Sequence, residues 1–155
     1  MSRQIRKVIE ADVPQLKKII DSTELFPSHM LDDMISDYLR NEASNDIWFT
    51  TLENERPISV GYCAPERLTE GTYNLYAIGV DKKFQGQGIG MKMMSYIENV
   101  LRENGQRILI VETSGQPVFE LTREFYVKCN YVKQANIPEF YEEGDDKIVF
   151  WKKLN

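Results

Sequence analysis

Three glycines stand at alternate positions, Gly86, Gly88 and Gly90, within the segment QGQGIG. A run rich in β-branched and aromatic residues, TYNLYAIGV at 72–80, precedes them, and a long amphipathic run follows. A glycine-rich turn between a strand and a helix aims several backbone N–H groups at one point, with the positive end of the helix dipole behind them. Such a turn binds anions, above all phosphate groups. The spacing therefore predicts a phosphate-binding loop over residues 85–90.

Three phosphate-binding patterns compete for this loop. A Walker loop needs Lys-Ser or Lys-Thr after its last glycine, and Met91 follows Gly90, which excludes that class. A dinucleotide fingerprint needs G-x-G-x-x-G, so the last interval is one residue short, although Glu112 follows at the distance of a ribose-binding acid. Only 43 residues follow Glu112, too few to complete a doubly wound sheet. The third pattern, Q/R-x-x-G-x-G/A, matches Gln85 to Gly90 at every fixed position.

Hydrophobic periodicity predicts the elements that position this loop. Helical spacing is found at residues 12–23, 28–42, 90–105 and 119–129, and strand-like runs at 3–10, 46–53, 57–64, 72–80, 107–113, 131–137 and 147–154. Asp12 is the expected N-cap of the first helix, and Gly105 is the expected glycine after the third. The order β-α-α-β-β-β-α-β-α-β-β predicts an α/β fold: a mixed sheet with helices on both faces. No linker interrupts the chain, so residues 1–155 are predicted to form a single domain.

Composition excludes several function classes. The net charge of the 155-residue chain is −5, which argues against general nucleic-acid binding. No run approaches the 18 apolar residues of a membrane span, and the N-terminus lacks the apolar region of a secretory signal. Cys63 and Cys129 match no metal or redox motif, and the single His29 has no Cys or His partner nearby in sequence. We therefore expect a cytoplasmic protein with reduced thiols, no bound metal and no membrane or nucleic-acid partner.

Together with NLYAIGVDKKF before it and EFYVKCNY after it, the Gln85 to Gly90 motif resembles the GNAT N-acetyltransferase superfamily. The predicted element order is also that of the family, so the resemblance extends over nearly the whole chain. It implies a GNAT-like fold that binds acetyl-CoA, with the pyrophosphate on the loop. It also implies direct transfer of the acetyl group to a primary amine in a ternary complex. The implied acetyl-CoA contacts are Ile78, Gly79, Val80, Gln85, Gly86, Gln87, Gly88, Ile89, Gly90 and Met91.

In the family, the strand before the glycines bulges and splays from the next strand, leaving backbone groups for the pantetheine. The resemblance places Ile78, Gly79 and Val80 there, and a glycine inside a strand fits a bulge or a close backbone approach. A backbone N–H from this stretch would also stabilise the oxyanion of the reaction.

Two catalytic residues follow from the resemblance and from elementary acid–base chemistry. Tyr126, in FYVKCNY, aligns with the family's tyrosine and would protonate the departing thiolate. A lysine-like amine of pKa about 10.4 is neutral in only about 1 of 2,500 molecules at pH 7, so a base should also matter. Glu112, at the end of the apolar strand, is the expected base, directly or through water, although in some members water alone carries the proton. One departure is Phe119, which stands where many members have an asparagine that holds the pantetheine.

The resemblance implies that the acceptor is a primary amine of a small molecule or a peptide, and its identity stays open. Asn74 and Tyr76 alternate along the strand before Gly79 and would face the acceptor. Glu66 and Tyr141 are further acceptor-binding candidates in acid-rich segments, and acidic walls would concentrate a cationic amine.

Two other function classes also stay open. The fold could bind acyl-CoA without turnover, as a sensor or interaction module; Tyr126 and Glu112 count against this, because a binding module needs neither. A dinucleotide-binding domain is the third hypothesis. The antiparallel edge strands, with Trp48 and Trp151 in strand-like runs, leave room for a homodimer interface.

Overall fold

The computed structural model describes residues 3–155, and the chain forms two compact units. The first unit comprises the chain up to Ala64 together with Tyr76–Ile97, and the second comprises Pro65–Leu75 together with Glu98–Asn155. Two strands and one helix contain residues of both units, one of the strands by its last residue alone.

The elements follow the predicted order, in a mixed α/β arrangement with a central mixed sheet. The helices are α1 Val13–Thr23, α2 Leu31–Arg40, α3 Ile89–Glu103 and α4 Glu120–Lys128. The strands are β1 Arg3–Lys7, β2 Ile47–Glu53, β3 Arg56–Pro57, β4 Ser59–Pro65, β5 Thr72–Val80, β6 Ile108–Ser114, β7 Val132–Glu142 and β8 Asp145–Lys153. The two-residue β3, which pairs with the end of β2, is an addition to the predicted set.

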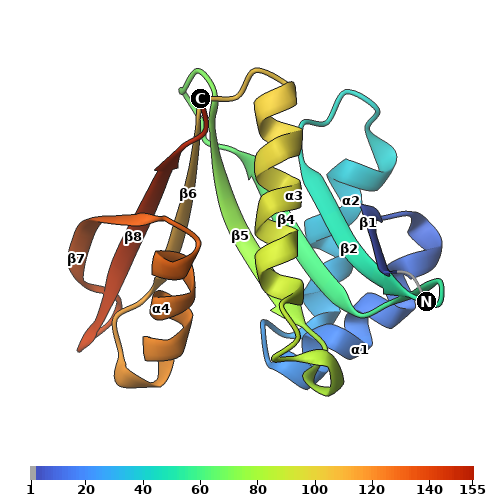
Figure 1. The fold of residues 1–155 in the computed structure, drawn as a ribbon, viewed down its shortest axis with the longest axis horizontal. Helices are drawn as coiled ribbons and strands as arrows, with labels where there is room; N and C mark the ends of the chain where they lie inside the picture. Colours follow the sequence, from blue (N-terminus) through green and yellow to red (C-terminus); the bar gives the residue numbers. More distant parts are fainter. Residues whose placement is uncertain (1–2) are drawn as a thin grey trace. The chain divides into compact units, whose positions relative to one another are not determined.

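In the first unit, β1 and β4 lie on either side of β2, and both pairs are antiparallel (Figure 1). Neighbouring residues of β2 point to opposite faces of the sheet. Trp48 packs into the core formed with α1 and α2, whereas the ring of Phe49 lies 5.7 Å from that of Tyr96 on α3. The side chains that bury α1 and α2 are Leu16, Ile19, Ile20, Leu31 and Ile35. The prediction of helices on both faces is therefore confirmed here.

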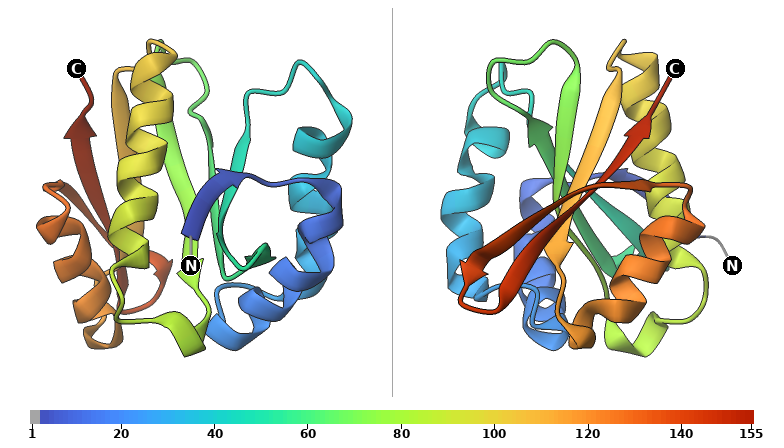
Figure 2. Two further views of the ribbon diagram at one scale, coloured as in Figure 1. Left: turned by 45° about the vertical axis from the view of Figure 1, so that its right-hand side comes forward. Right: turned by 90° about the vertical axis from the view of Figure 1, so that its left-hand side faces the viewer.

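In the second unit, Thr72–Leu75 of β5 pair with Ile108–Val111 of β6 in parallel, and β8 pairs antiparallel with β6 on its other side (Figure 2). The helix α3 ends as its sequence predicts. Gly105 has φ +78°, its N–H donates to the Arg102 carbonyl, and the Gln106 N–H donates to the Leu101 carbonyl. This pair of bonds is the Schellman motif, which satisfies carbonyls that the helix end leaves without partners.

The closing hairpin is longer than its sequence pattern indicates. The strand-like runs predicted at 131–137 and 147–154 leave an acidic segment between them, but β7 and β8 extend through it and leave a turn at Glu143 and Gly144. Gly144 has φ +81°, a conformation that tight hairpin turns need. Pairing with β8 therefore overrides the loop preference of a charged run.

A buried polar cluster joins three elements of the second unit. Glu98 on α3 is 6% exposed. Its carboxylate accepts hydrogen bonds from the Tyr131 hydroxyl at 2.7 Å and from Lys152 Nζ at 2.9 Å. Lys152 also donates to the Cys129 carbonyl at 3.0 Å, at the end of α4. Both partners of the ion pair are thus hydrogen-bonded, as a buried charge requires.

Both cysteines, Cys63 and Cys129, are buried and form no disulfide. Burial raises the pKa of each thiol above its ordinary value. Among residues 3–155, none of the helices combines the length and apolarity that crossing a bilayer requires. Over the same residues, no group of three or more His, Cys, Asp or Glu side chains is arranged to hold a metal ion.

Candidate active site

The glycine loop lies between the end of β5 and the start of α3, within the first unit. The Asp81 carboxylate accepts the Lys83 N–H at 3.0 Å and caps the short turn after the strand. Gln85 folds back, and its Nε2 donates to the Val80 carbonyl at 2.9 Å. Arg3 of β1 donates to the Gln87 side chain at 2.5 Å. Side chains on both sides therefore hold the loop in one conformation.

Gly86 and Gly88 both have φ +79°, a left-handed conformation that side chains disfavour. A Cβ added at either position would meet no atom within 4 Å, so the backbone faces open space rather than packed protein. The 15-residue helix α3 begins at Ile89, and the first N–H groups of a helix have no partner within it. Lys82, Lys83 and Lys92 are exposed nearby in the sequence. This open, electropositive backbone fits the pyrophosphate of a coenzyme.

Gly79 lies near the end of β5, between the half-buried Ile78 and Val80. A Cβ at this position would lie 3.4 Å from the Leu25 side chain and 3.5 Å from the Thr23 hydroxyl, both ordinary contact distances. The packing of the first unit therefore does not require a glycine here. A ligand that approaches the backbone closely would require one.

Tyr126 lies on α4 and is 4% exposed. Its ring contacts those of Tyr131 and Phe150, with centroids 6.1 and 5.8 Å away. Burial, and after it the neighbouring Cys129, raises the pKa of the phenol above its ordinary value of 10. The adjacent Phe125 is half-buried and is the more exposed of the two rings. The phenol is thus held in its neutral, proton-donating form.

Glu112 on β6 forms an ion pair with Lys147 on β8, at 3.0 Å between Oε2 and Nζ. The two side chains are 26% and 13% exposed. Lys147 Nζ also lies 4.1 Å from the centre of the Phe140 ring. Burial raises the pKa of Tyr141, and the charges of Glu112 and Asp145 add to this effect. Glu112 therefore lies close enough to Tyr141 for its charge to act on the phenol.

Asn74 and Glu66 take different positions in the second unit. Asn74 is 2% exposed, and its Oδ1 has no hydrogen-bond partner within residues 3–155. It lies opposite Ile110, two residues before Glu112 on β6. Glu66 instead closes the turn before β5, where its backbone N–H donates a hydrogen bond to the Thr72 carbonyl at 2.8 Å. Because Thr72 pairs with Ile108, Glu66 lies toward the far end of β6, about 13 Å along the strand from Glu112.

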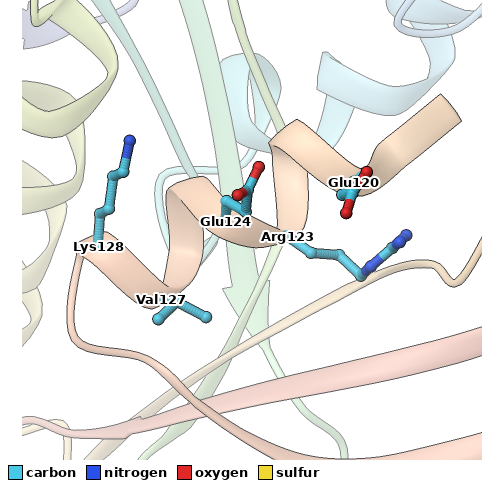
Figure 3. A pocket seen from close by; sticks show the side chains of 5 residues that line it. All are labelled: Glu120, Arg123, Glu124, Val127 and Lys128. Carbon is cyan, nitrogen blue, oxygen red and sulfur yellow. The ribbon is translucent and has the colours of Figure 1, made fainter. Parts of the chain in front are cut away.

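Sequence reasoning missed a small pocket on the surface of α4, shown in Figure 3. Its lining residues are Glu120, Arg123, Glu124, Val127 and Lys128. The guanidinium of Arg123 is occupied by the carbonyls of Ser114 and Gln116, at 2.8 and 2.9 Å. The spacing of Glu120, Glu124 and Lys128 on one face of the helix is the sequence signal, but it is also typical of a solvated face.

Known proteins match this chain in sequence and in fold. The acetyltransferase (GNAT) family matches residues 12–131. A GNAT-family protein of Desulfovibrio desulfuricans has a TM-score of 0.93 at 25% identity, over 99% of this chain and 100% of its own. The protein yncA of Salmonella typhimurium, solved with acetyl-CoA, has a TM-score of 0.82 at 15% identity, over 100% and 95%. An uncharacterized N-acetyltransferase of Methanocaldococcus jannaschii is 29% identical over 84 residues, which are 54% of this chain and about half (53%) of that relative.

Proposed function

Because the chain belongs to the GNAT acetyltransferase family, we propose that it is an acetyl-CoA-dependent N-acetyltransferase that acts on a primary amine of a small molecule or peptide. The observation that carries the proposal is the loop from Gln85 to Gly90. Two left-handed glycines with open space above them lead directly into the N-terminus of a long helix. No structural need of the first unit accounts for that openness, whereas the phosphates of a coenzyme do.

Acetyl-CoA supplies the thioester whose acetyl group is transferred to the amine. Gly86, Gly88 and the first N–H groups of α3 would hold its pyrophosphate, and the neighbouring lysines would balance its charge. The backbone of Ile78, Gly79 and Val80 would hold the pantetheine. One N–H of this stretch would stabilise negative charge on the carbonyl oxygen.

Tyr126 is the proposed general acid, which gives its phenolic proton to the leaving sulfur. Because burial raises its pKa, the phenol stays protonated throughout the neutral range. The raised pKa also lowers the driving force for proton transfer from the phenol to a thiolate of pKa about 8.5. The position of the phenol beside the leaving sulfur must therefore contribute to the rate.

Glu112 is the proposed base, and its ion pair with Lys147 holds the carboxylate in a fixed position. Because this carboxylate is already paired with an ammonium, it would act through a bridging water. The water would take the proton from the amine and give one to the carboxylate. Asn74, Tyr76 and Tyr141 are the proposed acceptor contacts. Glu66 is the weakest candidate because it lies toward the far end of β6 from Glu112.

Calorimetric titration of acetyl-CoA, desulfo-CoA and NAD, followed by thiol release with a panel of amines, tests this function. We expect micromolar affinity for acetyl-CoA, weak affinity for NAD, and thiol release that depends on the amine. Acetyl-CoA binding without release across the panel would favour a non-catalytic acyl-CoA sensor. Binding of NAD alone would refute the proposal and favour a dinucleotide-binding domain.

A further inference from the structure

Three aromatic rings of the first unit form a row, named here the aromatic row: Trp48 of β2, Tyr62 of β4 and Tyr76 of β5. The rings of Trp48 and Tyr62 are stacked, with centroids 4.2 Å apart and planes 9° from parallel. The Tyr62 and Tyr76 rings follow at 5.6 Å. Trp48 is fully buried, Tyr62 is half-buried and Tyr76 is 50% exposed. The row therefore leads from the core to an exposed aromatic face.

A carboxylate without a cation stands beside this row. Asp46, immediately before β2, is half-buried and hydrogen-bonded to the Tyr62 hydroxyl. Across residues 3–155, none of the Lys or Arg ion pairs involves Asp46 or its neighbour Asp37. Partial burial of a charge normally comes with a partner of opposite sign.

The aromatic row begins next to the backbone that would hold the thioester. Tyr76 precedes Ile78 by two residues on β5. Two residues of strand span about 7 Å. The exposed ring of the aromatic row thus lies close, along β5, to the backbone that would hold the thioester.

We propose that the aromatic row and Asp46 bind a second cationic group of the amine acceptor. The substrate class is then a diamine or longer polyamine. An ammonium is attracted to the faces of tyrosine rings. It would also pair with the Asp46 carboxylate, which has no cationic partner within residues 3–155. A neutral aromatic group would stack on Tyr76 but would leave the carboxylate unpaired. The inference rests on the proposed acetyltransferase function and names the substrate class of that site.

The test compares diaminohexane with hexylamine, which share a chain length and differ in the second ammonium. We expect kcat/KM, measured by thiol release from acetyl-CoA, to be roughly ten-fold higher for diaminohexane. In Asp46→Asn and in Tyr76→Leu this ratio should fall toward one. Asp21→Asn, which removes an exposed acid on α1, is the matched control for charge and should keep the wild-type ratio.

Calorimetry with the two amines separates failure of this inference from failure of the proposed function. Thiol release from both amines with a wild-type ratio near one would overturn the second-cation subsite and leave the acetyltransferase function standing. If no amine releases thiol, tighter binding of diaminohexane that Asp46→Asn abolishes would still support the subsite. Equal binding of the two amines, or an equal loss in Asp21→Asn, would overturn it.

Discussion

Replacing Gly88 by alanine tests the loop most directly, because Gly105 offers a matched control. The two glycines have φ values of +79° and +78°, and an added Cβ meets no atom within 4 Å at either position. Both substitutions therefore carry the same backbone strain and no steric clash. Only Gly88 lies in the loop that is proposed to hold the coenzyme phosphates.

The strain of a left-handed alanine is about 1–2 kcal/mol, and the smaller entropy of the unfolded chain offsets about 0.4–1 kcal/mol of it. Each variant should therefore lose about 1 kcal/mol of unfolding free energy, a shift of roughly 2–4 °C in Tm for a chain of this size. In Gly88→Ala the strained loop would also present one of its N–H groups poorly to the phosphates. Losing one hydrogen bond to a charged group costs about 1.5–3 kcal/mol, or about 10- to 150-fold in acetyl-CoA affinity.

The assay is calorimetric titration of acetyl-CoA into both variants, with urea unfolding of each alongside. Equal losses of stability combined with weaker binding in Gly88→Ala alone are the expected result. Wild-type affinity in Gly88→Ala, or the same affinity loss in Gly105→Ala, would refute the assignment of the loop to the pyrophosphate.

Three further changes test the chemistry and the fold. Tyr126→Phe should lower kcat by about 10²-fold and leave acetyl-CoA affinity unchanged, because only the transferred proton is lost; thiol release at the wild-type rate would remove Tyr126 as the acid. Glu112→Gln should slow the reaction more at pH 7 than near pH 10, where the amine loses its proton unaided; a constant ratio across the pH range would contradict its role as the base. Asp12→Ala should cost about 3 kcal/mol at pH 7, because it leaves the Arg6 guanidinium and the Ile9 N–H without their shared acceptor. Burial opposes ionisation of Asp12, but these bonds outweigh it and lower the pKa of its carboxyl. Its stabilisation is thus present above the unfolded pKa of about 3.9 and is lost as the pH falls through the folded one. Urea unfolding at pH 7 and pH 3 should show the difference between Asp12→Ala and wild type shrinking in acid, and an undiminished difference would disprove the linkage.

Local signals predicted much of the fold. The glycine at position 105 ends α3 as its sequence context indicates, and the apolar run at 107–113 forms a strand parallel to β5. Asp12 is the residue before α1, as expected. However, its side chain accepts from Arg6 and Ile9 rather than capping that helix. The residues next to Asp12 in the sequence are enough to predict where the helix begins. The partners of its carboxylate also depend on Arg6, which lies on β1.

Contacts between distant residues were beyond sequence reasoning. Glu112 and Lys147 meet only because β6 and β8 pair in one particular register. Likewise, the stacking of Trp48 on Tyr62 depends on the pairing of β2 with β4, in which the two residues are opposite each other. Neither register is encoded in the spacing of residues along one strand. Within the candidate site, the loop was therefore the part that the sequence predicted best. The surroundings of the acceptor were the part that it predicted least.

The buried cysteines bear on how turnover of this protein is measured. Disulfide reagents that detect released coenzyme react with thiolates. A thiol that is shielded from solvent and has a raised pKa is rarely in the thiolate form, so it reacts slowly. Cys63 is fully enclosed, and Cys129 is 8% exposed. In the folded protein, a reagent added continuously during turnover should thus report free coenzyme over a flat background. A burst of two protein thiols per chain would instead signal unfolding, so the same reagent reports on the integrity of the fold as well as on coenzyme release.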